Sequence, residues 1–243
     1  MELDSKSQYE QELCLLPYFQ ELTRKESAEY ALNVAKDLKA RGMINDCHIP
    51  AHTIGNENFK KFSGQEGAAF INCPTGCLEG CFHGVMEEYV KKIGTTEKIV
   101  SHLFDICSVV GTTQKLKTIC FHGIGHGILL HNPSKIIQAT QLCQSIVEIP
   151  DRVACLTGVF MENANSYLTL SETKLRSKIP LICQLVANTD NLNMCLQKLG
   201  EGLAIFTDNN FTKAREICGE FTDDSHYKEC IAGVDSAEQS PMN

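Results

Sequence analysis

Apolar residues recur along this chain at spacings of three and four, which place them on one face of a helix. One such stripe covers 96–107 and is followed by Gly111, a residue that often lies just past a helix end. Similar stripes cover 113–124, 136–143 and 191–206. The alternation of apolar and polar residues that is typical of strands is scarce. The pattern therefore predicts an all-α protein.

Polar residues at the ends of these stripes predict where two of the helices begin. Thr23 and Glu26 have the spacing of a capping box, and they would start a helix that Gly42 ends. Thr113 precedes another stripe and can accept a hydrogen bond from the first turn of that helix.

The last eight cysteines form a repeat. They fall into four pairs: Cys107 and Cys120, Cys143 and Cys155, Cys183 and Cys195, Cys218 and Cys230. Within a pair the cysteines are 12 or 13 residues apart, and equivalent cysteines of successive pairs are 35 to 40 residues apart. This period is typical of stacked antiparallel helical hairpins, so the sequence predicts an α-solenoid-like repeat of 35–40 residues.

In each unit the first cysteine lies near the end of one helix and the second lies near the start of the next. A short hairpin brings such residues within disulfide range, and each bond would stabilise by about 3 kcal/mol in the chain-entropy model. Buried reduced thiols are one alternative. A thiolate metal cluster is another, although only Cys73, Cys77 and Cys81 have the required four-residue spacing. We expect hairpins stapled by disulfides.

The five N-terminal cysteines obey the repeat less strictly. They are Cys14, Cys47, Cys73, Cys77 and Cys81. Because their number is odd, one of them is free, metal-bound or joined to another chain. A bridge from Cys14 to Cys47 across a first hairpin is plausible, and the other pairings stay open.

Composition limits the class of protein. The 243 residues include 13 cysteines and carry a formal net charge of −8, which argues against nucleic acid or an anionic membrane as a partner. No apolar run reaches the roughly 18 residues needed to span a bilayer. With no linker in the sequence, we expect one domain over 1–243, with a histidine-rich half at 1–131 and stapled repeats at 132–243.

The cysteine content indicates an oxidising compartment. The polar start of the chain predicts no signal peptide, but a secreted or periplasmic protein whose signal has been removed would look the same.

Histidines follow the cysteines in three successive predicted helices. Each helix carries a His-x-x-x-His or His-x-x-x-Glu motif, formed by His48 and His52, His83 and Glu87, and His122 and His126. Residues four apart share one helix face, so each motif presents two metal ligands together.

The Cys-Phe-His-Gly motif occurs twice, 39 residues apart, which puts His83 and His122 at equivalent places in neighbouring repeats. Later repeats carry Thr157, Gln197 and Ala232 there, although packing needs would be similar. We therefore predict that His48, His52, His83, Glu87, His122 and His126 converge on one metal site.

Other ionisable residues are weaker candidates for this site. Glu88 is as well explained by solvent exposure, and Glu162 aligns with it in the repeat. His102, His131 and His226 lie outside the scheme and are expected at the surface.

Five imidazoles and a carboxylate exceed the needs of one tetrahedral zinc ion, so one or two transition metal ions are expected. If the cysteines are oxidised, only nitrogen and oxygen ligands remain, which favours iron or copper in a metal-dependent oxidoreductase with a small-molecule substrate. Three alternatives stay open. They are a zinc-dependent hydrolase, a metal-sequestering or delivery protein without turnover, and a helical scaffold for a peptide or glycan.

Overall fold

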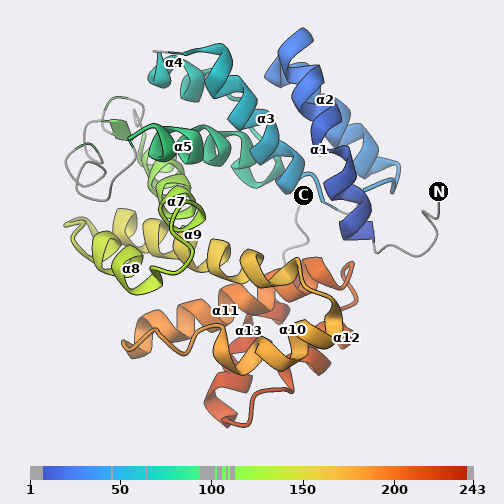
Figure 1. Ribbon diagram of the computed structural model, residues 1–243, viewed down its shortest axis with the longest axis vertical. Helices are drawn as coiled ribbons and strands as arrows, with labels where there is room; N and C mark the ends of the chain where they lie inside the picture. The colour runs from blue at the N-terminus through green and yellow to red at the C-terminus, as the bar shows by residue number, and fades with distance from the viewer. Residues whose placement is uncertain are drawn as a thin grey trace.

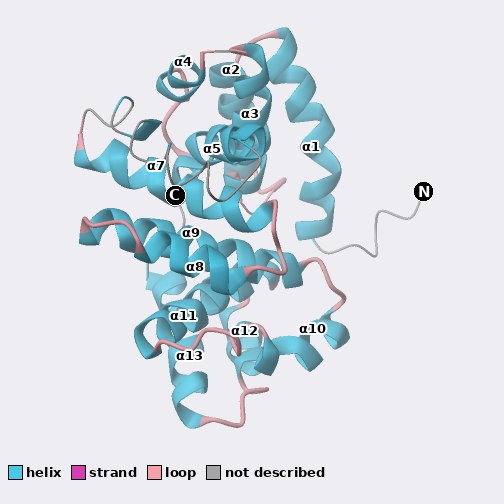
Figure 2. Cartoon of the chain, turned by 60° about the vertical axis from the view of Figure 1, so that its left-hand side comes forward, coloured by secondary structure: helices cyan, strands magenta, loops and turns pink. Residues whose placement is uncertain are grey.

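The computed structural model describes residues 8–44, 46–63, 65–93, 102, 106, 107, 109 and 113–239, and all regular elements in these ranges are helices (Figure 2). The predicted all-α class is confirmed. Most of the helix expected over 96–107 lies outside the described residues. Among the described helices, none combines the length and the hydropathy that a bilayer crossing requires.

The described helices are, in chain order, α1 Gln8–Lys25, α2 Ala28–Ala40, α3 His48–Lys61, α4 Glu66–Ile71, the 3-10 turn η1 Cys77–Glu79, α5 Gly80–Ile93, α7 Gln114–Leu130, α8 Ile136–Gln144, α9 Ile149–Leu168, α10 Glu172–Lys178, the 3-10 turn η2 Ile179–Leu181, α11 Thr189–Phe206, α12 Phe211–Cys218 and α13 Asp224–Gln239.

Six of these helices form a continuous stack. Each packs on the next in the order α3, α5, α7, α9, α11 and α13. In Figure 1 the colours of these helices accordingly run from blue to red across the molecule. The shorter helices α4, α8 and α12 pack on the stack helix that follows each of them, while α1 and α2 pack on α3. This order of contacts agrees with stacked hairpins. The solenoid class and the single domain over 1–243 stay predictions.

Pairs of stack helices touch through their backbones at glycine. A Cβ atom added at any of six glycines would lie 2.0 or 2.1 Å from a carbonyl oxygen of the neighbouring helix. These glycines form three reciprocal pairs: Gly55 with Gly84 between α3 and α5, Gly125 with Gly158 between α7 and α9, and Gly200 with Gly233 between α11 and α13. Equivalent glycines recur every 70 to 75 residues, so the close packing repeats with twice the period of the cysteines.

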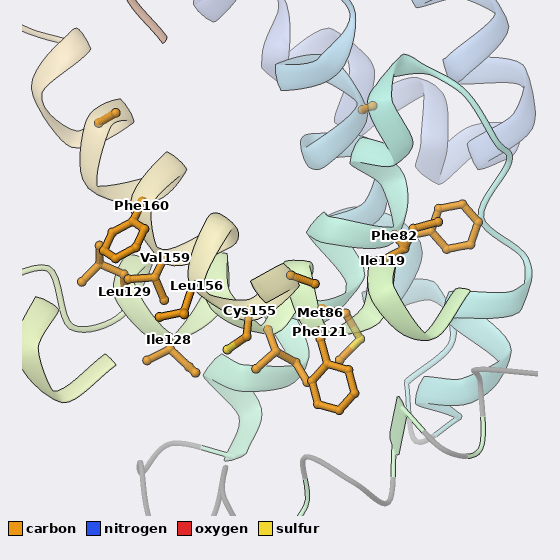
Figure 3. Packing of buried hydrophobic residues seen from close by; sticks show 14 of the residues in the cluster. Phe82, Met86, Ile119, Phe121, Ile128, Leu129, Cys155, Leu156, Val159 and Phe160 are labelled. Carbon is orange, nitrogen blue, oxygen red and sulfur yellow. The ribbon is translucent and has the colours of Figure 1, made fainter. Parts of the chain in front are cut away.

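Apolar side chains fill the space between the stack helices. Leu156, Val159 and Phe160 of α9 lie beside Ile128 and Leu129 of α7, and all five are buried (Figure 3). Fully burying each such side chain contributes roughly 1.5–3 kcal/mol, so this packing is a major source of the fold's stability.

All four predicted hairpin disulfides are confirmed. Cys107–Cys120, Cys143–Cys155, Cys183–Cys195 and Cys218–Cys230 have Cα–Cα distances of 5.5 to 6.0 Å. Two further disulfides join N-terminal cysteines.

The bridge from Cys14 to Cys47 is wrong. Cys47 pairs with Cys77, and Cys73 pairs with Cys81. The physical reason is that Cys47 is buried whereas Cys14 lies on the exposed side of α1, outside these six disulfides.

One of the two predicted helix starts is also wrong. Thr113 does cap α7, because its hydroxyl accepts a hydrogen bond from the Leu116 amide at 3.3 Å. Thr23 instead lies inside α1, where its buried hydroxyl donates to the Phe19 carbonyl at 2.8 Å. The cap of α2 is Ser27, four residues later than predicted.

Candidate metal centre

The helices α3, α5 and α7 run parallel at the predicted site. A Cβ on Gly80 would contact His48 and one on Gly84 would contact His52, so contacts advance in the same direction along α3 and α5. On α7, Gly123 faces His83 and Gly127 faces Glu87 in the same sense. This register brings the histidine-bearing turns of three helices to one level.

Five imidazole rings meet at this level. Neighbouring ring centroids are 4.5 to 5.5 Å apart across the set formed by His48, His52, His83, His122 and His126. The structure therefore brings together all five histidines that the sequence singled out, and the carboxylate of Glu87 contacts His52 among them.

Four of these histidines have the Nδ1 atom engaged by an oxygen. His48 Nδ1 lies 2.9 Å from the carbonyl oxygen of Cys77, and His52 Nδ1 lies 2.5 Å from Glu87 Oε1. His126 Nδ1 lies 3.1 Å from Glu162 Oε2. Carbonyl and carboxylate oxygens only accept, so these three rings carry their proton on Nδ1.

The fourth ring, His122, is fixed in the same way by a hydroxyl. Its Nδ1 lies 2.9 Å from Thr157 Oγ1, and Thr157 donates its own proton to the Ala154 carbonyl at 2.8 Å. The hydroxyl oxygen must then accept from His122. In this tautomer each of the four Nε2 atoms keeps its lone pair, which is the form that binds a metal ion.

These Nε2 lone pairs point at each other. The Nε2 atoms of His48 and His52 are 3.0 Å apart, and those of His122 and His126 are 3.2 Å apart. Two lone pairs repel at this distance, so either a proton or a metal ion must lie between the two nitrogens of each pair. Two nitrogens bound tetrahedrally to one ion lie roughly 3.3 Å apart, close to both separations.

His83 lies between the two pairs. Its ligand atoms come within 4.8 Å of those of His48 and His52, and also within 4.8 Å of those of His122 and His126. Its buried Nδ1 atom has no hydrogen-bond partner, which is costly for a polar atom inside a protein. The geometry therefore consists of two three-histidine groups that share His83.

Two carboxylates complete the centre. Glu87 and Glu162 form a third possible metal-binding group with His126. Glu88 belongs to none of these groups and pairs with Lys91 at 3.3 Å, with its side chain 17% exposed. The sequence makes Glu162 a weaker candidate than Glu87, because Glu162 aligns with Glu88. The alignment does not show that the side chain of Glu162 on α9 faces His126 on α7.

Burial and mutual repulsion keep most of these imidazoles neutral. Burial, followed by the charge on His52, lowers the pKa of His48 to about 3. Burial and the neighbouring histidines likewise lower the pKa values of His83 and His122 well below the usual value. His52 differs: burial opposes its charge, but Glu87, together with Glu162 and Asp46, outweighs burial and raises its pKa. Neutral imidazole is the form in which histidine binds metal.

A strained turn supports His48. Cys77, Leu78 and Glu79 have φ values of 50, 51 and 61°, a left-handed conformation that costs roughly 1–2 kcal/mol per residue. The disulfide Cys47–Cys77 ties this turn to the start of α3, and Cys73–Cys81 ties the segment before the turn to α5. The carbonyl oxygen of Cys77 is thereby held where it accepts from His48.

A cavity of about 530 Å³ opens beside the centre. Its wall includes His48, His52, Glu87 and Glu162, whereas His83, His122 and His126 lie behind them, outside its lining. The cavity therefore reaches the centre at His48 and His52.

The remaining histidines lie apart from this cluster. His102 and His131 are exposed, and the ring of His226 packs against Phe221 at 5.9 Å. Comparison of the chain with models of protein families, with curated proteins and with solved structures found no match.

Proposed function

We propose that this protein is a metalloprotein that binds two transition metal ions, one in each three-histidine group. His83 is the shared ligand, with one ring nitrogen on each ion after its ring proton has passed to solvent. The observation that carries this proposal is the pair of facing Nε2 lone pairs at 3.0 and 3.2 Å, with every opposing Nδ1 atom already engaged. The unpartnered Nδ1 of His83 supports it, because a second ion would supply the missing partner.

The ligand chemistry favours iron or copper. The neighbouring cysteines Cys47, Cys81 and Cys120 are all in disulfides, so thiolates are not available and the donors are imidazole and carboxylate. Such donors suit redox-active iron and copper as well as zinc. Since the accessible cavity also permits a small molecule to approach, we favour a metal-dependent oxidoreductase.

The six disulfides favour an oxidising compartment. We therefore propose that the protein works in a secreted or periplasmic setting, where these bonds persist. A net charge of −8 agrees with a small-molecule substrate better than with nucleic acid.

A zinc-dependent hydrolase is the second candidate. The carboxylate of Glu162 favours it, because it lies at the cavity wall and contacts His126, where it is placed to act as a general base. A storage or delivery protein without turnover is less well supported, since the cavity leaves one side of the centre accessible.

Metal analysis tests the proposal directly. The full chain should be purified without a histidine tag, its metal content measured by elemental analysis, and the analysis repeated on single variants. We expect two equivalents in the wild-type protein, about one in His122→Gln, and fewer than one in His83→Gln because both groups lose a ligand. His131→Gln is the control, since His131 is exposed and distant from the cluster, and it should retain two equivalents.

The identity of the metal then separates the candidates. Iron or copper supports the oxidoreductase, and zinc supports the hydrolase. A wild-type protein that binds no metal, even after incubation with iron, copper and zinc salts, overturns the proposal. Two equivalents in His83→Gln overturn the shared ligand while leaving a metal site.

A further inference from the structure

The cavity beside the centre has one apolar wall. Its apolar lining is Leu13, Leu16, Ile49, Leu129, Leu130 and Pro133. Leu13 and Leu16 are three residues apart on α1, so both face the cavity from one side of that helix. At about 530 Å³ the cavity is large enough for a small organic ligand, since such sites typically measure roughly 300–1,000 Å³.

A second part of the lining is a polar stripe on α9. Glu162, Asn165, Ser166 and Thr169 line the cavity at the spacing that places residues on one helix face. Ser166 and Thr169 are exposed, whereas Glu162 contacts the buried His126. The stripe therefore runs from the mouth of the cavity to the metal centre, over roughly 10 Å along the helix axis.

The polar wall offers mainly hydrogen-bond acceptors. The Ser166 hydroxyl donates to the Asn163 carbonyl at 2.7 Å, and the Thr169 hydroxyl donates to the Ser166 carbonyl at 3.3 Å. Their oxygens can then only accept from a ligand, as can the carboxylate of Glu162. Asn165 alone on this stripe brings an amide donor.

Charge narrows the class of ligand further. Among the described residues that line the cavity there is no lysine or arginine, and the two acidic residues are Glu87 and Glu162. An anionic group near the mouth would lose its hydration without gaining a counter-charge. The cavity is therefore suited to an uncharged molecule.

We propose that this cavity is the substrate site of the metal centre, and that it takes an uncharged, elongated molecule of about 10 Å. One edge of that molecule is apolar, and the other carries hydroxyl or amide N–H donors. Its innermost polar atom meets the ion held by His48 and His52, because these two residues line the cavity and His122 and His126 do not. The inference rests on the proposed metal centre.

Alkyl hydroxamates test the length and polarity of the site. Octanohydroxamic acid and acetohydroxamic acid share the same metal-binding end, which is neutral in solution and loses its proton when it binds the ion, and they differ by six methylene groups. Both should be titrated calorimetrically into the metal-loaded full chain, with metal content measured before and after. Because each buried methylene strengthens binding by roughly fourfold, we expect the longer compound to bind at least about 100-fold more tightly.

Variants of two leucines, one in the cavity wall and one outside it, locate the effect. Leu16→Ser should weaken octanohydroxamic acid by about tenfold or more and leave acetohydroxamic acid unchanged, because only the chain contacts α1. Leu185→Ser is the control, since Leu185 is 54% exposed and does not line the cavity, and it should bind both compounds like the wild type. Octanedioic monohydroxamic acid carries a carboxylate at the far end and should bind about tenfold more weakly than the octyl compound.

The outcomes separate this inference from the metal centre. Equal affinities for the short and long hydroxamates on a metal-loaded protein overturn the substrate site but leave the metal centre standing. No effect of Leu16→Ser, or equal binding of the carboxylate-ended chain, also overturns it. A protein that holds no metal overturns both.

Discussion

Replacing Gly84 with alanine is the most direct test of how the fold positions the metal ligands. Gly84 lies on α5, and a Cβ atom there would sit 2.0 Å from the His52 carbonyl oxygen of α3. An ordinary contact between these atoms needs about 3.3 Å, so the two helices must separate by roughly 1.3 Å. Ligand distances in a metal site tolerate only about 0.2 Å.

The same substitution can be made at an equivalent position far from the centre. Gly233 lies on α13, and its added Cβ would sit 2.0 Å from the Gln197 carbonyl oxygen of α11. Overpacking costs about 1–3 kcal/mol, and the better helix propensity of alanine offsets up to about 1 kcal/mol. We therefore expect both variants to lose a similar net stability, of order 1–2 kcal/mol.

Metal affinity should distinguish the two variants. Gly84→Ala moves His48 and His52 away from His83, so we expect its metal affinity to fall by at least tenfold, whereas Gly233→Ala should bind like the wild type. Urea unfolding followed by circular dichroism gives the stabilities, and competition with a chelator gives the affinities. Wild-type affinity in Gly84→Ala would refute a site shared between α3 and α5. Equal losses in both variants would show that general destabilisation explains the effect.

Three further substitutions probe the hydrogen bonds and staples around the centre. Glu87→Gln should lower metal affinity about 10- to 100-fold because His52 loses its carboxylate partner, while Glu88→Gln should leave the affinity unchanged. Competition with a chelator measures both affinities, and equal losses in the two variants would contradict the role of Glu87. Thr157→Val removes the oxygen that accepts from His122, so we expect one of the two ions to bind about tenfold more weakly in a calorimetric titration. A two-phase titration unchanged from wild type would argue against this contact. Replacing Cys218 and Cys230 together with serine should lower the free energy of unfolding by about 3 kcal/mol, measured by urea denaturation, with metal content unchanged. Loss of metal in that variant would count against a local effect.

Much of the fold could be predicted because pairs of cysteines recur at a regular spacing along the sequence. Cysteines 12 or 13 residues apart mark a hairpin, and each of the four predicted pairs is a disulfide. The convergence of the histidines was also predictable, since residues such as His83 and His122 recur at equivalent positions. That these residues bind metal stays a proposal.

The features that could not be predicted depend on how helices approach each other. Glycine spacing alone does not show that Gly55 and Gly84 meet, because a reciprocal contact involves two helices. Whether the side chain of Glu162 faces His126 depends in the same way on how α9 is rotated about its own axis relative to α7. The partner of Cys47 could not be predicted because Cys77 lies in a left-handed turn, which has no clear signal in the sequence.

The double period of the glycines has a mechanical consequence. In the α3/α5 and α7/α9 pairs an added Cβ would lie 2.0 or 2.1 Å from a carbonyl oxygen, whereas α5 and α7 are less close, since a Cβ on Gly123 would lie 2.8 Å from Met86 Cβ and 3.1 Å from His83 Cα. The centre lies across this looser seam, because His83 belongs to one pair and His122 to the other. Bound ions would therefore link the α3/α5 pair to the α7/α9 pair. Removing the ions should weaken the contact between α5 and α7 without unfolding either pair.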